Sequence, residues 1–301
     1  MKLQRGVDAT QALQSASHKV FVEGSTDEEI DPIVISELLR INGLTQIEVR
    51  PMGSCDNVRS AAQTLIRHHP AYYFLIDRDD QQQDIVETSW KNFPNPDTHN
   101  MLIWHKRELE NFFIDPDYIG KSLFLKSNIS MRTLKQRIIK ECNRRIFLDA
   151  ANLTLAALKR RIRTQFAPDF SNPIQFKTEA DGARVLEESP ELEDKRNSFA
   201  QIFEKNEVNR IYSDFVLELS GGNLPLRYGS GTWLERMSGK EVFRFIAGSC
   251  FRVEAADGTI LQGKLQNNEI AKELLKLPLE QQPNNFQLLV NLLKVRVKSG
   301  A

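Results

Sequence analysis

Short apolar runs alternate with helical patterns in the first third of the chain. The apolar runs predict strands at 18–22, 46–50, 72–76 and 101–104. They are rich in β-branched and aromatic residues and end in polar turns, as buried parallel strands do. Ser25 and Thr26, with Glu29 three residues after Thr26, predict a capping box and a helix that runs to Arg40. A second helix is predicted over 56–68. Strands separated by helices indicate βαβ units, so we expect an α/β fold with a parallel sheet.

Beyond residue 116 the pattern becomes mainly helical. Leu134, Ile138, Cys142 and Ile146 form an apolar stripe, which predicts an amphipathic helix over 130–147. The remaining expectations are a helix at 150–163, a loop at 171–183, a helix at 191–206, a strand or helix at 212–219, turns at 221–233, a helix at 240–246, a hairpin at 250–261 and helices at 270–275 and 286–297. We expect an α/β core at 1–120, a helical arm at 121–215 and an α+β extension at 216–301, with 1–17 a polar lead-in containing a short helical turn.

Composition narrows the class of protein. The chain has 301 residues, of which 41% are apolar and 27% charged, and no apolar run approaches the length of about 20 residues that spans a membrane. Cys55, Cys142 and Cys250 have no paired spacing, so neither a disulfide framework nor a zinc site is expected. We therefore expect a cytoplasmic globular protein.

The formal net charge of zero hides an uneven distribution. Residues 121–166 hold twelve Lys and Arg against two acids, whereas residues 179–194 hold seven acids against one Arg. A solvated helix face can be basic without binding anything, but this excess is typical of phosphate-backbone binding. The candidate nucleic-acid contacts are Arg132, Lys140, Arg144, Arg145, Lys159, Arg160 and Arg161. No motif for sequence-specific readout is visible, so RNA and DNA both remain open.

Acidic residues follow two of the predicted strands. Glu23-Gly24 comes after the first, with Asp27 close behind, and Asp77-Arg78-Asp79 comes after the third. Such acids can be helix caps or polar turns. However, parallel strands end at one edge of the sheet, where ligands bind in open α/β folds. Converging carboxylates at that edge suit Mg²⁺, or Mn²⁺ in its place, so Glu23, Asp27, Asp77 and Asp79 are the candidate ligands.

Glu108 and Glu110 follow the fourth predicted strand and could reach the same edge. Residues two apart point in different directions on a strand or a helix, so at most one should be a ligand. We choose Glu108, although both could be surface acids.

The paired acidic motifs resemble the Toprim domain, whose marks are a Glu-Gly after the first strand and an Asp-x-Asp after a later one. The Glu23-x-x-x-Asp27 spacing and the run 105–116 are similar to the OLD-type nuclease branch, and within it to the stand-alone Toprim effectors of the PARIS anti-phage defence system. The resemblance covers residues 18 to 120 and Ser238-Gly239-Lys240. It implies a Toprim-like (Rossmannoid) sheet, a Mg²⁺-dependent endonuclease in which Glu23 is catalytic, and a role for Lys240 near the scissile phosphate.

The resemblance also implies control by another protein. The chain has no G-x-x-x-x-G-K-[ST] phosphate loop, so an ABC-type ATPase would be a separate partner. A homodimer is one candidate for the active form, and residues 179–194 and 286–297 are candidate docking surfaces. The alternatives are an OLD-like DNA endonuclease of repair and a Toprim-like module that binds nucleic acid or protein without catalysis.

Overall fold

The computed structural model describes residues 18–65, 69–95, 100–163 and 178–299. The helical turn predicted within 1–17, the end of the helix predicted over 56–68 and most of the loop predicted over 171–183 lie outside these ranges. The chain forms two compact units, one from Met1–Arg144 with Thr232–Ala301 and one from Arg145–Gly231. This division differs from the one expected at 120 and 215, because residues 121–144 and 232–301 belong with the sheet.

The sheet has four parallel strands in the order β2-β1-β3-β4. They are β1 (His18–Val22), β2 (Ile47–Pro51), β3 (Tyr72–Ile76) and β4 (Met101–Ile103). Val20 of β1 lies opposite Val49 of β2 and Tyr73 of β3. The predicted α/β class and the parallel sheet are confirmed, and β1 and β3 have the predicted bounds. Because β1 and β3 are neighbours, the residues after them lie side by side.

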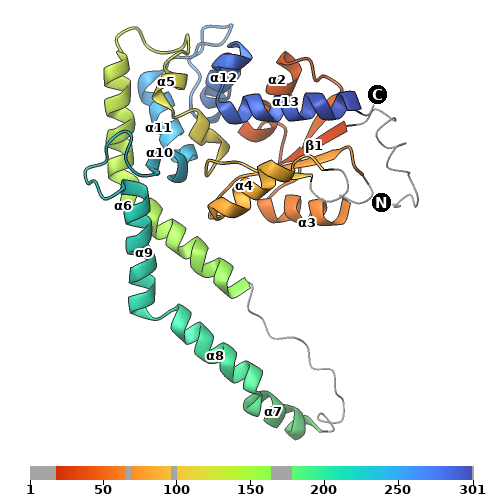
Figure 1. The fold of residues 1–301 in the computed structure, drawn as a ribbon. Helices are drawn as coiled ribbons and strands as arrows, with labels where there is room; N and C mark the ends of the chain where they lie inside the picture. The colour runs from red at the N-terminus through yellow and green to blue at the C-terminus, as the bar shows by residue number, and fades with distance from the viewer. Residues whose placement is uncertain (1–17, 66–68, 96–99, 164–177, 300–301) are drawn as a thin grey trace. The chain divides into compact units, whose positions relative to one another are not determined.

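Helices cover both faces of the sheet (Figure 1). On one face α3 (Cys55–Leu65) and α4 (Gln83–Asn92) pack on β3 and β4. Val58 and Val86 from these helices meet Phe74, Ile76 and Ile103 in one buried cluster. The other face carries α2 (Ile30–Ile41) with α13 (Asn284–Ser299) against it.

Helix α2 begins later than the sequence predicts. Its N-cap is Glu29, whose side chain makes no capping hydrogen bond, so the predicted capping box from Thr26 is wrong. Pro32 is tolerated in the first turn of a helix that begins at Ile30, but it would lie inside one that began at Thr26. The intervening residues are a turn, in which Gly24 exchanges backbone hydrogen bonds of 2.9 and 2.7 Å with Gly53.

The first unit also contains shorter helices before α6 (Met131–Arg163) and several helices after residue 232. They are η1 (Leu109–Phe112), α5 (Pro116–Ile119), α10 (Trp233–Arg236), α11 (Gly239–Cys250), α12 (Gly263–Leu275) and η3 (Leu279–Gln281). Both α11 and α12 are longer than predicted. The predicted hairpin at 250–261 is reduced to a tight turn with one antiparallel bridge between Glu254 and Ile260. Helix α13 buries Phe286, Leu289 and Leu293 in the core, so its apolar face is not a docking surface.

Helix α6 runs without a break from Met131 to Arg163. Two helices were predicted here, but the chain between them has no Gly or Pro to end the first. The predicted stripe is confirmed, since Leu134, Ile138, Cys142 and Ile146 are all buried. The boundary between the two units falls within this helix, after Arg144.

The second unit continues with α7 (Glu179–Glu188), α8 (Pro190–Ile202) and α9 (Lys205–Ser220). Residues 179–183 were predicted as loop, but the Thr178 hydroxyl accepts a hydrogen bond from the backbone N–H of Asp181 at 3.1 Å and so caps α7. Residues 212–219, left open between strand and helix, are helical. Among the described helices, none is both long and apolar enough to cross a membrane.

Candidate active site

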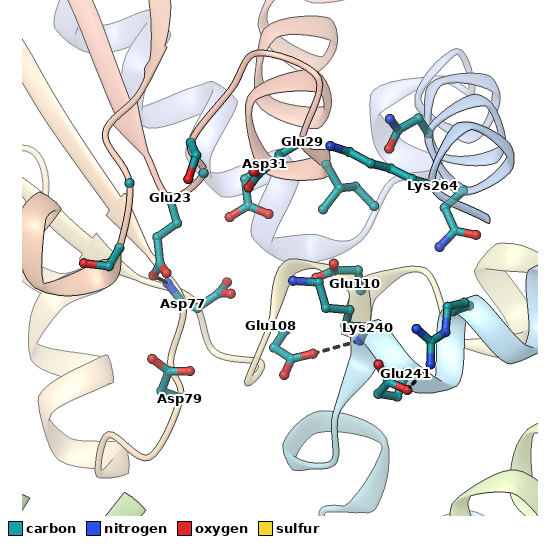
Figure 2. Close-up of a pocket in the computed structure, with 18 residues that line it drawn as sticks. Glu23, Glu29, Asp31, Asp77, Asp79, Glu108, Glu110, Lys240, Glu241 and Lys264 are labelled. Carbon is teal, nitrogen blue, oxygen red and sulfur yellow. Dashed lines mark hydrogen bonds and ion pairs between the residues drawn. The ribbon is translucent and has the colours of Figure 1, made fainter. Parts of the chain in front are cut away.

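Two carboxylates meet at the ends of the central strands. Glu23 directly follows β1 and Asp77 directly follows β3. One carboxylate oxygen of Glu23, Oε1, accepts a hydrogen bond of 2.9 Å from the backbone N–H of Asp77 (Figure 2). Burial raises the pKa of Glu23, although the Asp77 N–H lowers it in part. The predicted convergence of Glu23 and Asp77 is present.

Asp77 is the less satisfied of these two carboxyl groups. Its Oδ1 atom is buried and receives no hydrogen bond from the described residues. Burial raises the pKa of Asp77 well above its usual range, and the nearby carboxylates of Asp31 and Glu23 raise it further. A buried anionic oxygen without a donor is costly, so this position favours a cation.

Asp79 holds the turn after β3 in a strained conformation. Its φ of 47° is in the left-handed region, which non-glycine residues rarely adopt. Its backbone N–H donates to the carbonyl of Arg107 at 3.1 Å, and its own carbonyl accepts from Arg236 at 3.2 Å. Burial raises the pKa of Asp79, which Arg107 partly offsets. Strain that the surroundings maintain in this way is typical of functional turns.

The acidic cavity contains Asp31 and not Asp27. Asp27 is exposed and lines a separate surface groove with Glu48 and Lys272. Asp31 lies in the first turn of α2 and lines the cavity with Glu23. Burial raises the pKa of Asp31 well above its usual range, and Glu110 and Glu23 add to the rise. An acid in the first turn of the helix after β1 was the signal that could have found it.

Both Glu108 and Glu110 line the cavity, so the prediction that at most one of them is a ligand remains a prediction. Glu108 is the extended N-cap of the 3₁₀ helix η1, so neither strand nor α-helix geometry holds the two side chains apart and both reach the same cavity. Glu110 is 5% exposed, and burial, reinforced by Glu108, raises its pKa to about 7.

Glu108 is largely engaged with the N-terminus of α11. Its Oε2 atom accepts from the backbone N–H of Lys240 at 2.8 Å, and the Ser238 hydroxyl lies 3.3 Å from both of its carboxylate oxygens. Asn111 completes this contact, because its Nδ2 donates to the carbonyls of Leu234 and Met237 at 3.0 Å each. We call these contacts between η1 and residues 234–240 the clasp.

The clasp brings Lys240 into the cavity, as predicted. Nearby Glu110 raises the pKa of the lysine, followed by Glu108 and Asp31, so Lys240 stays charged beside the acids. Gly239 is required for this approach. A Cβ atom added there would lie 2.5 Å from the backbone nitrogen of Asn111, closer than any packing allows.

The cavity has a volume of about 710 Å³. Cations from α11 and α12, namely Lys240, Arg244 and Lys264, share it with acids. The acids that line it are Glu23, Glu29, Asp31, Asp77, Asp79, Glu108, Glu110 and Glu241.

In the described ranges, no three His, Cys, Asp or Glu side chains are arranged so that they could by themselves hold a metal ion. Proteins usually hold Mg²⁺ through one or two carboxylates, with water and substrate phosphates completing the octahedron. The unpartnered Oδ1 of Asp77 and the crowded acids around it fit that mode of binding. The residues present therefore suit a cation bound jointly by protein, water and substrate better than one enclosed by protein ligands alone.

The candidate nucleic-acid contacts fall into two groups. Arg132, Lys140 and Lys159 are exposed. Three others form ion pairs: Arg144 with Glu141, Arg145 with Asp149 and Arg161 with Glu207. Arg160 is half-buried and also interacts within the chain.

Arg145 is the clearest correction. It is 8% exposed and lies 3.2 Å from the fully buried Asp149, so its charge is paired inside its own unit and cannot contact a phosphate backbone. The sequence could not distinguish it from Arg144, which is exposed.

Comparison with known protein families, with curated proteins and with solved structures finds no match to this chain. The candidate site therefore rests on its own geometry and chemistry.

Proposed function

We propose that the chain is a metal-dependent nuclease of the Toprim type that hydrolyses phosphodiester bonds. The observation that carries the proposal is the convergence of Glu23, Asp31, Asp77 and Glu110 in one cavity at the carboxyl edge of the parallel sheet. Acids gathered where they raise one another's pKa are typical of functional sites. The exposed cations of α6 support a nucleic-acid substrate.

Asp77 and Glu23 would hold Mg²⁺ or Mn²⁺, with Asp31 and Glu110 beside them and Asp79 on the flanking turn. When bound, the metal would supply a polarised phosphate and an activated water. Lys240 would offset negative charge that develops on the scissile phosphate. Glu108 would position the N-terminus of α11, and with it Lys240, through its 2.8 Å contact.

We further propose that the nuclease is an effector resembling AriB of the PARIS system, which a separate AriA-like ATPase would hold inactive. The chain has no phosphate loop of its own. With the apolar face of α13 in the core, the acidic stretch that includes Asp181, Glu187 and Glu193 is the remaining candidate docking surface.

The test compares acids inside and outside the cavity. Glu23→Gln and Asp77→Asn should each abolish Mg²⁺-dependent cleavage of total RNA or plasmid DNA and weaken Mn²⁺ binding in calorimetry at least tenfold. Asp27→Asn is the matched control, because Asp27 follows the same strand but lies outside the cavity. It should cleave and bind metal as the wild type does.

Full activity in Glu23→Gln or Asp77→Asn would refute the nuclease proposal. Loss of activity in Asp27→Asn as well would favour the ligand set predicted from the sequence, to which Asp27 belongs. If the wild-type protein binds nucleic acid but binds no metal and cleaves nothing, it is a binding module instead.

A further inference from the structure

The turn that carries Asp79 is held by residues far along the chain. Asp79 lines the cavity with Asp77, which ends the strand side of the same turn (Figure 2). A φ of 47° is unfavourable for a residue with a Cβ atom, so the surrounding contacts must maintain it. Two of these contacts come from outside the turn, one on each side of the Asp79 Cα atom.

The two peptide groups that flank this Cα atom are bonded to different segments. The N–H of Asp79, in the first peptide group, donates to the carbonyl of Arg107 at 3.1 Å. The carbonyl of Asp79, in the second, accepts from Nη1 of Arg236 at 3.2 Å. Peptide groups are planar, so fixing the orientation of both groups fixes φ and ψ between them. The two bonds therefore also fix the direction in which the carboxylate leaves the backbone.

Arg236 contacts the turn at a second point. It is the last residue of α10 and is 4% exposed, and its Nη1 atom also donates to the carbonyl of Gln81 at 3.5 Å. A buried guanidinium is costly unless its N–H groups find acceptors. Here one nitrogen reaches two carbonyls of the same turn, on either side of Asp80, so the turn cannot change shape without loss of these bonds.

The two segments that hold Asp79 are joined to each other as well. The N–H of Arg107 donates to the carbonyl of Glu235 at 2.7 Å, and Nη1 of Arg107 donates to the carbonyl of Arg236 at 3.5 Å. Asp79, Arg107 and Arg236 thus belong to one closed network of hydrogen bonds between three segments of the first unit. In a closed network, displacement of any one member disturbs the other two.

We propose that Arg236 is a positioning residue for the metal site, which holds the carboxylate of Asp79 toward the cation that Asp77 and Glu23 would bind. Arg236 does not line the cavity, so it acts on the metal only through Asp79. The inference rests on the proposed function. It adds to that function a residue outside the cavity and gives a second role to the segment that carries Lys240.

The first experiment measures Mn²⁺ binding to the full chain by calorimetry in Arg236→Met, Asp79→Asn and the double variant. Methionine is long and unbranched but has no donor, and asparagine tolerates the left-handed region, so Asp79→Asn removes the charge and keeps the turn. Each single variant should bind Mn²⁺ about tenfold more weakly than the wild type. The double variant should bind no more weakly than Asp79→Asn, because an effect that acts through the carboxylate is lost with it.

Arg137→Met is the matched control. Arg137 belongs to the same unit and also donates to a backbone carbonyl, that of Ser249 at 3.0 Å, but it does not line the cavity. It should bind Mn²⁺ as the wild type does. Additive losses in the double variant, wild-type affinity in either single variant, or an equal loss in Arg137→Met would each overturn the proposal.

The second experiment needs no variant. Native-state hydrogen exchange of the wild type in EDTA, over a urea series, compares the amides of Asp79, Arg107 and Arg236, each of which is hydrogen-bonded. Residues of one closed network should open in one cooperative step, with the same protection and the same urea dependence. An Asp79 amide at least tenfold less protected than that of Arg236 would overturn the proposal, whether or not Arg236→Met folds.

Failure of this inference and failure of the nuclease are distinguishable. Metal-dependent cleavage that Arg236→Met leaves unchanged would keep the nuclease and remove the positioning role. A loss of Mn²⁺ affinity that is coupled to Asp79, in a protein that cleaves nothing, would do the reverse.

Discussion

Asp77 and Glu110 place carboxylates where water is scarce and other acids are near. Each is costly to ionise there, as the raised pKa values indicate. The folded protein therefore holds protons that the unfolded chain would release, and a cation entering the cavity would displace them. In the absence of metal, the site is a source of pH-dependent instability.

Glu110 gives this instability a pH window. Its pKa rises from 4.5 to about 7 on folding, so the native state binds the proton more tightly. The stabilisation that protonated Glu110 contributes is then fully present below pH 4.5 and is lost as the pH rises through 7. Between pH 5 and 8 the loss of unfolding free energy attributable to Glu110 should be on the order of 2 kcal/mol.

Urea unfolding in EDTA at pH 5 and pH 8 measures this loss, which Glu110→Gln should remove. Glu280→Gln is the control, because Glu280 is exposed and lies outside the cavity. A Glu110→Gln variant with the full wild-type pH dependence would show that Glu110 ionises normally in the folded state.

At the scale of residues, the sequence identified the acids that follow strands. Glu23, Asp77 and Asp79 could be predicted because parallel strands deliver their ends to one edge. Asp31 was missed, because recognising it as an acid in the first helical turn requires knowing where α2 begins, which the turn at Gly24 and the tolerance for Pro32 decide. The burial of Arg145 likewise depends on packing that a charge pattern does not reveal.

At the scale of elements, the clasp is the most constrained contact of the site. Asn111 is fully buried and uses its side chain to join three backbone positions: the N–H of Glu108 and the carbonyls of Leu234 and Met237. Each bond is to main chain, so the geometry of both elements is fixed together. Helix α11 can approach only because position 239 has no side chain.

Two glycines of α11 should therefore respond oppositely to alanine. Gly239→Ala should lower the unfolding free energy by about 2 kcal/mol or more, because the new methyl group collides with the backbone of Asn111. Gly248→Ala should raise it by about 0.5–1 kcal/mol, since its Cβ would meet nothing within 4 Å and alanine favours the helix.

Urea unfolding at fixed pH measures both changes, and cleavage assays should show a loss only for Gly239→Ala. A stabilised Gly239→Ala variant would mean that η1 and α11 are not held together as described.

Strands were easier to predict than helix ends. The bounds of β1 and β3 follow from short apolar runs closed by polar turns. The break predicted within α6 assumed a helix end without any glycine or proline to cause it. The η1 turn has no distinctive pattern, because it is held by a clasp to residues far along the chain.

At the scale of the whole molecule, positive and negative charges are concentrated in different segments of the chain. The exposed cations Arg132, Lys140 and Lys159 lie on α6, and nucleic-acid binding through them would act by counterion release. Reversing all three to Glu should weaken binding to every sequence tested. The slope of log K against log salt should become shallower by about 2 to 3.

Fluorescence anisotropy over a salt series measures both quantities. The control reverses three exposed lysines elsewhere, Lys91, Lys276 and Lys298, and so changes the net charge equally. Equal losses in the two triple variants would assign the effect to net charge and not to α6.

The division into units could not be predicted from composition. It falls inside a continuous helix, between Arg144 and Arg145, where no linker, glycine or proline marks it. The return of residues 232–301 to the first unit likewise depends on long-range packing. Only the position of Lys240 near the site was predicted, and that prediction came from the resemblance.

The clasp also bears on how the protein is made. On the ribosome, η1 emerges more than a hundred residues before Ser238, Gly239 and Lys240, so a growing chain displays its strand-end acids while Glu108 and Asn111 still lack their distant partners. Because chains emerge from the N-terminus first and translation is slow relative to local folding, this interval lasts for seconds. Lys240 can reach the cavity only after residues 232–240 have been made, so a polypeptide terminated before that point would carry the acids without the lysine that accompanies them.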